Sequence, residues 1–162
     1  MSAAAQSAKQ LLDEQINILT QLSQLLRVEY DLLSTQKPDD LQSYGEQKQN
    51  MVNDLEVLNR SWQDFLRAQG CEFTLEGIRK CLVQMDTGAT LGLESLWKTL
   101  STLSKDCQQQ NMINGAVIAL RQQVTQQAMD ILRGQSMGGS LYDNKGGHKP
   151  GDGSSGHTIA KA

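Results

Sequence analysis

The sequence has few of the residues that build β-sheets and sharp turns. Aromatic residues make up 4% of the 162 residues, and only two residues are proline. Sandwiches and barrels use many aromatic strand residues and many turn residues, so this composition argues against them. Glutamine is abundant, with runs at 108–110 and 122–123, and it is a good helix former. The composition therefore favours an all-α protein.

Several further absences exclude classes of partner. The net charge is −3 and no block of Lys or Arg occurs, which leaves little for binding nucleic acid or an anionic membrane surface. No apolar run approaches the length of a membrane span, and the first residues lack the features of a signal peptide. The three cysteines, Cys71, Cys81 and Cys107, are odd in number and form no C-x-x-C motif. We therefore expect a cytoplasmic protein with reduced thiols, no integral membrane segment and no nucleic-acid partner.

The residues that usually carry catalysis are also missing from the patterned part of the chain. Both histidines, His148 and His157, lie near the C-terminus, so no histidine of a helical core can act as a base for a Ser or Cys nucleophile. They have no cluster of cysteines or carboxylates at metal-ligand spacing beside them. Residues 151–156 match G-x-G-x-x-G, but no strand precedes them, so the match is a product of composition. We expect no enzyme, no metal and no cofactor.

The most regular pattern in the chain is an apolar seam between Leu41 and Phe65. Its residues fall at steps of three and four, the a/d spacing of packed helices. The seam consists of Leu41, Tyr44, Met51, Leu55, Leu58, Trp62 and Phe65, and it is broken once, at Lys48. We expect the first helix of the chain to cover this seam, so that it forms the scaffold and leaves partner binding to other surfaces.

Similar periodicity occurs in the rest of the first 133 residues. Two adjacent series repeat every seven residues near the N-terminus and make a broad apolar stripe: Leu12, Leu19, Leu26 and Leu33, and Leu11, Ile18, Leu25 and Leu32. A polar interval from Lys105 to Gln110 interrupts the last helix and predicts a stutter or a bend. Short connections imply antiparallel neighbours. The predicted fold is an all-α antiparallel bundle of three long helices and one short helix, with helices at 8–34, 39–69, 74–85 and 91–133.

The composition changes at Gly134. Residues 134–162 contain eight of the 14 glycines and show no periodicity apart from the apolar pair Leu141 and Tyr142. Such a segment buries too little surface to offset the entropy lost on ordering. We therefore expect a helical bundle over residues 1–133 and a disordered, Gly-rich tail over residues 134–162.

Lys48 has two interpretations. Its aliphatic stem could cover the seam while its ammonium group reaches water. Alternatively, an antiparallel hairpin that turns near residue 37 places Glu29 of the first helix level with Lys48. An ion pair between them would fix the register of the two helices at some cost in stability.

Residues 111–115, in the last helix, are polar apart from Met112 and Ile113. The simple interpretation is a helix face turned to solvent. The other is a partner-binding groove, because the thioether of methionine adapts to varied apolar surfaces. Trp62 and Trp97 are expected to anchor the packing between helices, with exposure for binding as the alternative.

Four features of the chain together resemble the FlgN family of flagellar type III export chaperones. They are a Leu-rich first helix with Glu29, the segment from Leu41 to Leu58 with Lys48, Met51 and Leu55, the late motif Asn111-x-x-Asn114-Gly115 followed by Val117, Ile118 and Leu120, and a Gly-rich end with Ser140-Leu141-Tyr142-Asp143 and Gly146. They span nearly the whole chain. The tail beyond Gly147 is longer and richer in Gly and Ser than the family pattern, so the resemblance implies nothing there.

The resemblance implies a cytosolic chaperone for the hook–filament junction proteins. Such a chaperone binds the C-terminal amphipathic helices of these proteins, prevents their premature assembly and delivers them to the cytosolic domain of the export gate. On this basis the expected surface for the exported protein consists of Met112, Ile113, Val117, Leu120 and Val124. Tyr142 is the candidate docking point for the gate.

Two other classes of function also fit the helical pattern. One is a coiled-coil adaptor that associates with itself through the same seams. The other is a helical-bundle regulator that binds a small ligand in a pocket with convergent polar groups. The helical pattern leaves the oligomeric state open.

Overall fold

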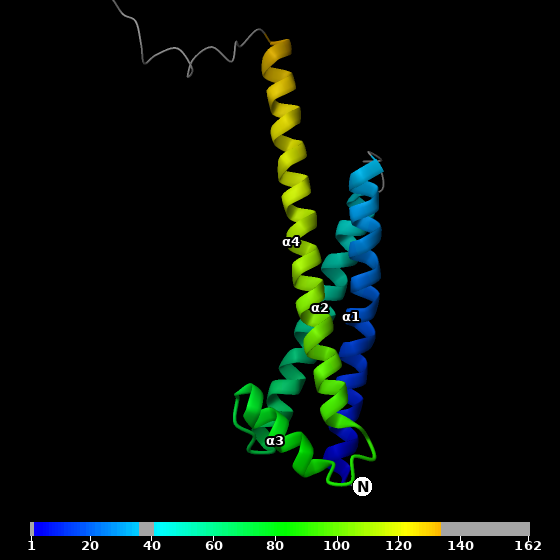
Figure 1. The fold of residues 1–162 in the computed structure, drawn as a ribbon, viewed down its shortest axis with the longest axis vertical. Coiled ribbons are helices and arrows are strands. Elements are labelled where there is room, and N and C mark those ends of the chain that lie inside the picture. Colours follow the sequence, from blue (N-terminus) through cyan, green and yellow to red (C-terminus); the bar gives the residue numbers. More distant parts are fainter. Residues whose placement is uncertain (1, 36–40, 134–162) are drawn as a thin grey trace, which may run out of the picture. The chain divides into compact units, whose positions relative to one another are not determined.

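The computed structural model describes residues 2–35 and 41–133, which form four helices (Figure 1). These are α1 (Ala3–Thr35), α2 (Leu41–Ala68), α3 (Leu75–Met85) and α4 (Leu93–Leu132). The predicted all-α class, with three long helices and one short helix, is confirmed. The expected turn near residue 37 and the tail at 134–162 lie outside the described residues.

The chain divides into two units, residues 1–121 and residues 122–162. The first unit holds α1, α2, α3 and α4 up to Arg121, and the second holds the last residues of α4. The boundary near residue 133 that the composition suggests stays a prediction.

The core of the first unit forms around α1. This helix buries Leu12, Leu19, Leu22 and Leu26, which fall at steps of three, four and seven on one broad face. It packs along α2 and also contacts α3. The leucines that repeat every seven residues, beginning with Leu12, therefore face the core, as the amphipathic pattern predicts.

The seam on α2 is only partly covered. Trp62 is its one fully buried residue, and seam residues such as Met51, Leu55 and Leu58 are half-buried. Their exposed sides leave apolar surface uncovered along α2. The first helix does pack along the seam, as expected, but it covers only one side of the stripe, because a single helix cannot enclose it.

A compact corner joins α2 to α3. Gly70 adopts a left-handed backbone (φ +68°) just after α2, and Thr74 caps α3 by accepting a hydrogen bond from the N–H of Gly77 at 2.9 Å. Gly77 itself has no room for a side chain, since an added Cβ would lie 2.6 Å from the carbonyl oxygen of Glu72. These contacts define the turn from α2 into α3 and leave α3 in contact with α1.

This corner corrects the expectation of three reduced thiols. Cys71 and Cys81 form a disulfide, with their Cα atoms 5.8 Å apart, whereas Cys107 is free and buried. Ten residues separate the two cysteines in sequence, and only the tight turn before α3 brings them within bonding range. Burial raises the pKa of the Cys107 thiol, whose Sγ donates a hydrogen bond to the carbonyl oxygen of Leu19 at 3.5 Å.

Candidate functional site

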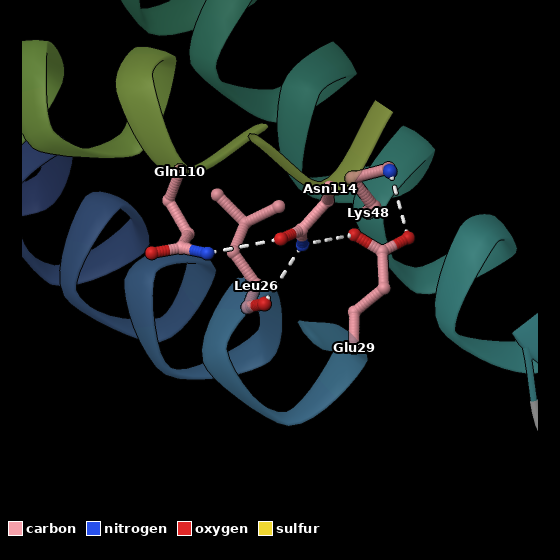
Figure 2. A network of polar contacts seen from close by, with 5 residues as sticks. All are labelled: Leu26, Glu29, Lys48, Gln110 and Asn114. Atoms are coloured by element: carbon pink, nitrogen blue, oxygen red, sulfur yellow. Dashed lines mark hydrogen bonds and ion pairs between the residues drawn. The ribbon is translucent and has the colours of Figure 1, made fainter. Parts of the chain in front are cut away.

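A buried polar cluster joins α1, α2 and α4 within the first unit (Figure 2). It consists of Glu29 from α1, Lys48 from α2, and Gln110 and Asn114 from α4, together with the carbonyl group of Leu26. Glu29 is 4% exposed and Asn114 is 0% exposed, so both carry polar groups into the core. Buried polar groups are costly unless their hydrogen bonds are satisfied, and these are.

Each polar atom of Asn114 has a partner. Its Nδ2 donates to Glu29 Oε2 at 2.7 Å and to the carbonyl oxygen of Leu26 at 2.8 Å. Its Oδ1 accepts from Nε2 of Gln110 at 2.9 Å. The second carboxylate oxygen of Glu29, Oε1, accepts from Nζ of Lys48 at 2.9 Å. The cluster therefore connects three helices through one carboxylate.

The contact between Glu29 and Lys48 is the one that heptad geometry suggests. The two side chains differ in burial, with Glu29 almost enclosed and Lys48 26% exposed. The ammonium group thus keeps some contact with water while neutralising a buried carboxylate. That this ion pair sets the register of α1 and α2 stays a prediction.

Asn114 is the residue that sequence reasoning missed. Residues 111–115 are helical, and Asn114 belongs to the core instead of to a helix face turned to solvent. The four buried residues of α4 are Leu93, Leu100, Cys107 and Asn114, at intervals of seven. Following that period from Leu93 would have identified Asn114 as a core position. It also carries the core face of α4 through the polar interval at 105–110, where the helix is continuous.

An apolar strip follows the polar cluster on the outside of α4. Met112 is 75% exposed and Leu120 is 61% exposed, while Ile113 is also exposed and Val117 is half-buried. Met112 and Ile113 line a shallow hollow of about 520 Å³, together with Lys105 and Ala116. The structure thus brings Met112 and Ile113 together in one hollow, and Val117 and Leu120 lie beyond its lining.

The other two candidate residues are placed differently. Val124 is exposed in the second unit, where Met129, Ile131 and Leu132 are exposed as well. Tyr142 lies outside the described residues.

The two tryptophans lie against each other. Trp62 of α2 and Trp97 of α4 stack with ring centroids 5.9 Å apart, Trp62 buried and Trp97 half-buried. They act as anchors between α2 and α4, and both also line one hollow.

The described residues contain neither a metal site nor a membrane-spanning helix. In residues 2–35 and 41–133, no three His, Cys, Asp or Glu side chains are grouped so that they could hold a metal ion. None of the helices in the same ranges combines the length and the apolar character of a membrane span.

The first unit is a helical bundle that leaves several apolar side chains exposed, among them Met112, Ile113 and Leu120 close together on α4. Exposed apolar surface of this kind is a feature of protein-binding surfaces. A family model described as "FlgN protein" matches residues 1–150, and the chain belongs to the FlgN family. This is a family of flagellar export chaperones, not of enzymes, and its members bind hook-associated proteins. No curated protein and no solved structure matches the chain.

Proposed function

We propose that the chain is a cytoplasmic chaperone for the hook–filament junction proteins. It binds the C-terminal amphipathic helices of these exported proteins, prevents them from assembling prematurely and delivers them to the cytosolic domain of the export gate. Membership of the FlgN family supports the general role. The observation that carries the binding mode is the apolar strip on α4, which is exposed in the free chain.

The chemistry of the strip suits an amphipathic helix. A helix with apolar side chains at positions i, i+3, i+4 and i+7 binds by laying those side chains on an apolar surface. Met112 offers a flexible thioether, and Leu120 offers an aliphatic side chain two turns further along. Full burial of such a side chain contributes roughly 1.5–3 kcal/mol, so a few of them account for specific binding.

The polar cluster supports this role from inside the bundle. It ties the middle of α4 to α1 and α2 through hydrogen bonds of 2.7–2.9 Å around Glu29 and Asn114. Asn114 lies between Met112 and Val117 in the sequence, so the same turns of α4 carry the cluster and the strip. A helix held in this way presents the strip without losing freedom on binding, which favours affinity.

The gate contact is proposed for Tyr142. The proposal depends on sequence alone, because Leu141 and Tyr142 form an apolar pair in a stretch rich in Gly, Ser and charged residues. A tyrosine supplies apolar area and a hydroxyl at little entropic cost, which suits a docking contact.

A substitution series tests the strip. Met112→Gln and Leu120→Gln should each weaken binding of the junction protein's C-terminal peptide by roughly tenfold, because each removes an apolar contact. The matched control is Val57→Gln on α2, since Val57 is 61% exposed, as is Leu120. Isothermal titration measures binding, and circular dichroism checks the fold. Equal affinity of all three variants and the wild type would remove the strip from the proposal.

Tyr142→Ala separates the two contacts of the chaperone. We expect the variant to bind the junction-protein peptide like the wild type and to lose binding to the purified cytosolic domain of the gate. Undiminished gate binding would show that Tyr142 is not the docking point.

A further inference from the structure

A second, deeper hollow lies in the first unit between α2 and α4. It has a volume of about 610 Å³, within the range of about 300–1,000 Å³ that is typical of ligand pockets. We name it the tryptophan groove. Its apolar lining includes Leu19 of α1, Val52, Leu55 and Trp62 of α2, and Trp97 and Leu100 of α4.

The groove is open because α2 lacks a full set of neighbours. Leu55 is half-buried although it belongs to the strongest apolar seam of the chain. Four-helix bundles close such a core with a fourth long helix. Here the remaining helix is α3, which has only 11 residues and contributes Leu75 to the lining. The groove therefore corresponds to the position of a missing helix.

The groove and the strip on α4 are continuous. Lys105 lines both hollows. Trp97, Ser101, Lys105, Gln108 and Met112 follow one another at steps of four, four, three and four, which places them on one side of α4. From Trp97 to Met112 this side is about 22 Å long at a rise of about 1.5 Å per residue, the length of a 15-residue helix.

We propose that a single amphipathic helix of the exported protein lies along this side of α4, with its apolar side chains in the tryptophan groove and on the strip. The inference rests on the proposed function and adds where the helix lies and which chemistry it needs. The helix completes a four-helix bundle with α1, α2 and α4.

The charges at the groove define the occupant more closely. Lys105 stands on the α4 wall and Glu56 on the α2 wall. Within residues 2–35 and 41–133, neither takes part in an ion pair. A partner helix with a carboxylate toward α4 and a basic side chain toward α2 matches both walls. Charges at such a rim mainly select the partner and its orientation.

Trp62 gives a second reason to expect an occupant. It lines the groove, and its indole Nε1–H is buried without an acceptor among the described residues. A buried donor without an acceptor is unfavourable. This cost is removed if the indole ring turns slightly and the partner places a carbonyl or hydroxyl oxygen where it accepts the Nε1–H.

The test uses the full chain and a tryptophan-free synthetic peptide of the C-terminal helix of a hook–filament junction protein from the same genome. Both tryptophans of the chain line the groove, so their fluorescence reports on its occupancy. We expect a saturable change in the emission of the wild type. Ser101→Phe places a phenyl ring in the groove and should weaken binding at least about tenfold.

The matched control is Ser95→Phe. Ser95 is exposed on the same helix and lies outside the lining of both hollows. It should leave the affinity unchanged. If Ser101→Phe proves unfolded by circular dichroism, Leu75→Gln replaces it, because Leu75 is exposed and its loss leaves no cavity. Val57→Gln is then the control.

The outcomes separate this inference from the proposed function. A wild type that does not bind the peptide overturns the proposed function and the inference with it. Binding by the wild type and equally by Ser101→Phe, or by Leu75→Gln in its place, overturns the groove alone. Light scattering adds a third outcome. If the wild type is a dimer and the groove variant is a monomer, a second copy of the chain occupies the groove. That result would overturn the proposal that a helix of the exported protein binds there.

Discussion

Replacing Asn114 by alanine tests whether the polar cluster holds α4 against α1. The substitution removes the donor of two hydrogen bonds, one of 2.7 Å to the carboxylate of Glu29 and one of 2.8 Å to the carbonyl oxygen of Leu26. A hydrogen bond to a charged group contributes about 1.5–3 kcal/mol and one to a neutral group about 0.5–1.5 kcal/mol. Gln110 is half-buried and can turn to water, so its lost bond adds little. The expected loss of unfolding free energy is therefore about 2–4 kcal/mol.

The chain supplies a matched control three residues earlier. Asn111 lies in the same helix but is exposed. Asn111→Ala makes the same chemical change and the same small gain in helix propensity, about 0.5 kcal/mol, without touching the cluster. The difference between the two variants isolates the contribution of the cluster.

Urea unfolding followed by circular dichroism measures both variants. A loss of about 2–4 kcal/mol is a large part of a typical unfolding free energy of 5–15 kcal/mol, so the midpoint should move clearly for Asn114→Ala. If the two variants unfold within about 0.5 kcal/mol of each other, the cluster does not hold the helices together and the reasoning from its hydrogen bonds is refuted.

Two further predictions concern other polar contacts. A double-mutant cycle of Glu29→Ala and Lys48→Ala should give a coupling energy of about 1–2 kcal/mol. The value is moderate because the ammonium group of Lys48 reaches water. Zero coupling would exclude a role of this ion pair in the register of α1 and α2. Partial burial raises the pKa of Asp86, but hydrogen bonds from the backbone N–H groups of Leu91 and Leu93 outweigh it and hold the pKa below its ordinary value. Such a carboxylate stabilises the fold at pH values above the pKa that it has in the unfolded chain. This stabilisation is lost as the pH falls through the lower pKa that the group has in the folded chain. Below about pH 4, the melting temperature should therefore fall more steeply for the wild type than for Asp86→Asn, and parallel curves would contradict this.

The helices could be predicted from the sequence because each depends on local periodicity. The expected ranges of 8–34, 39–69, 74–85 and 91–133 differ from the observed helices by one or two residues at most ends, and by five at the start of α1. The early start is local as well: Ser2 caps α1 by accepting the N–H of Ala5 at 3.1 Å, and Ala5 and Ala8 are buried. Small residues such as these give a weak apolar signal.

The candidate site was predictable only in part. The proximity of Glu29 and Lys48 follows from heptad positions and an antiparallel turn, because both are set by spacing along the chain. Asn114 follows the period of Leu93, Leu100 and Cys107, but its amide looks like a surface group until the core around it is known.

The sequence by itself determined which residues share a face of each helix, and with them the all-α class and the level at which Glu29 and Lys48 meet. Only the tertiary structure decided what covers each face. It left the α2 seam half-covered, opened the groove at Trp62 and Trp97, and brought Cys71 to Cys81. The physical reason is that periodicity fixes the direction of a side chain, whereas burial depends on the neighbours that long-range packing supplies.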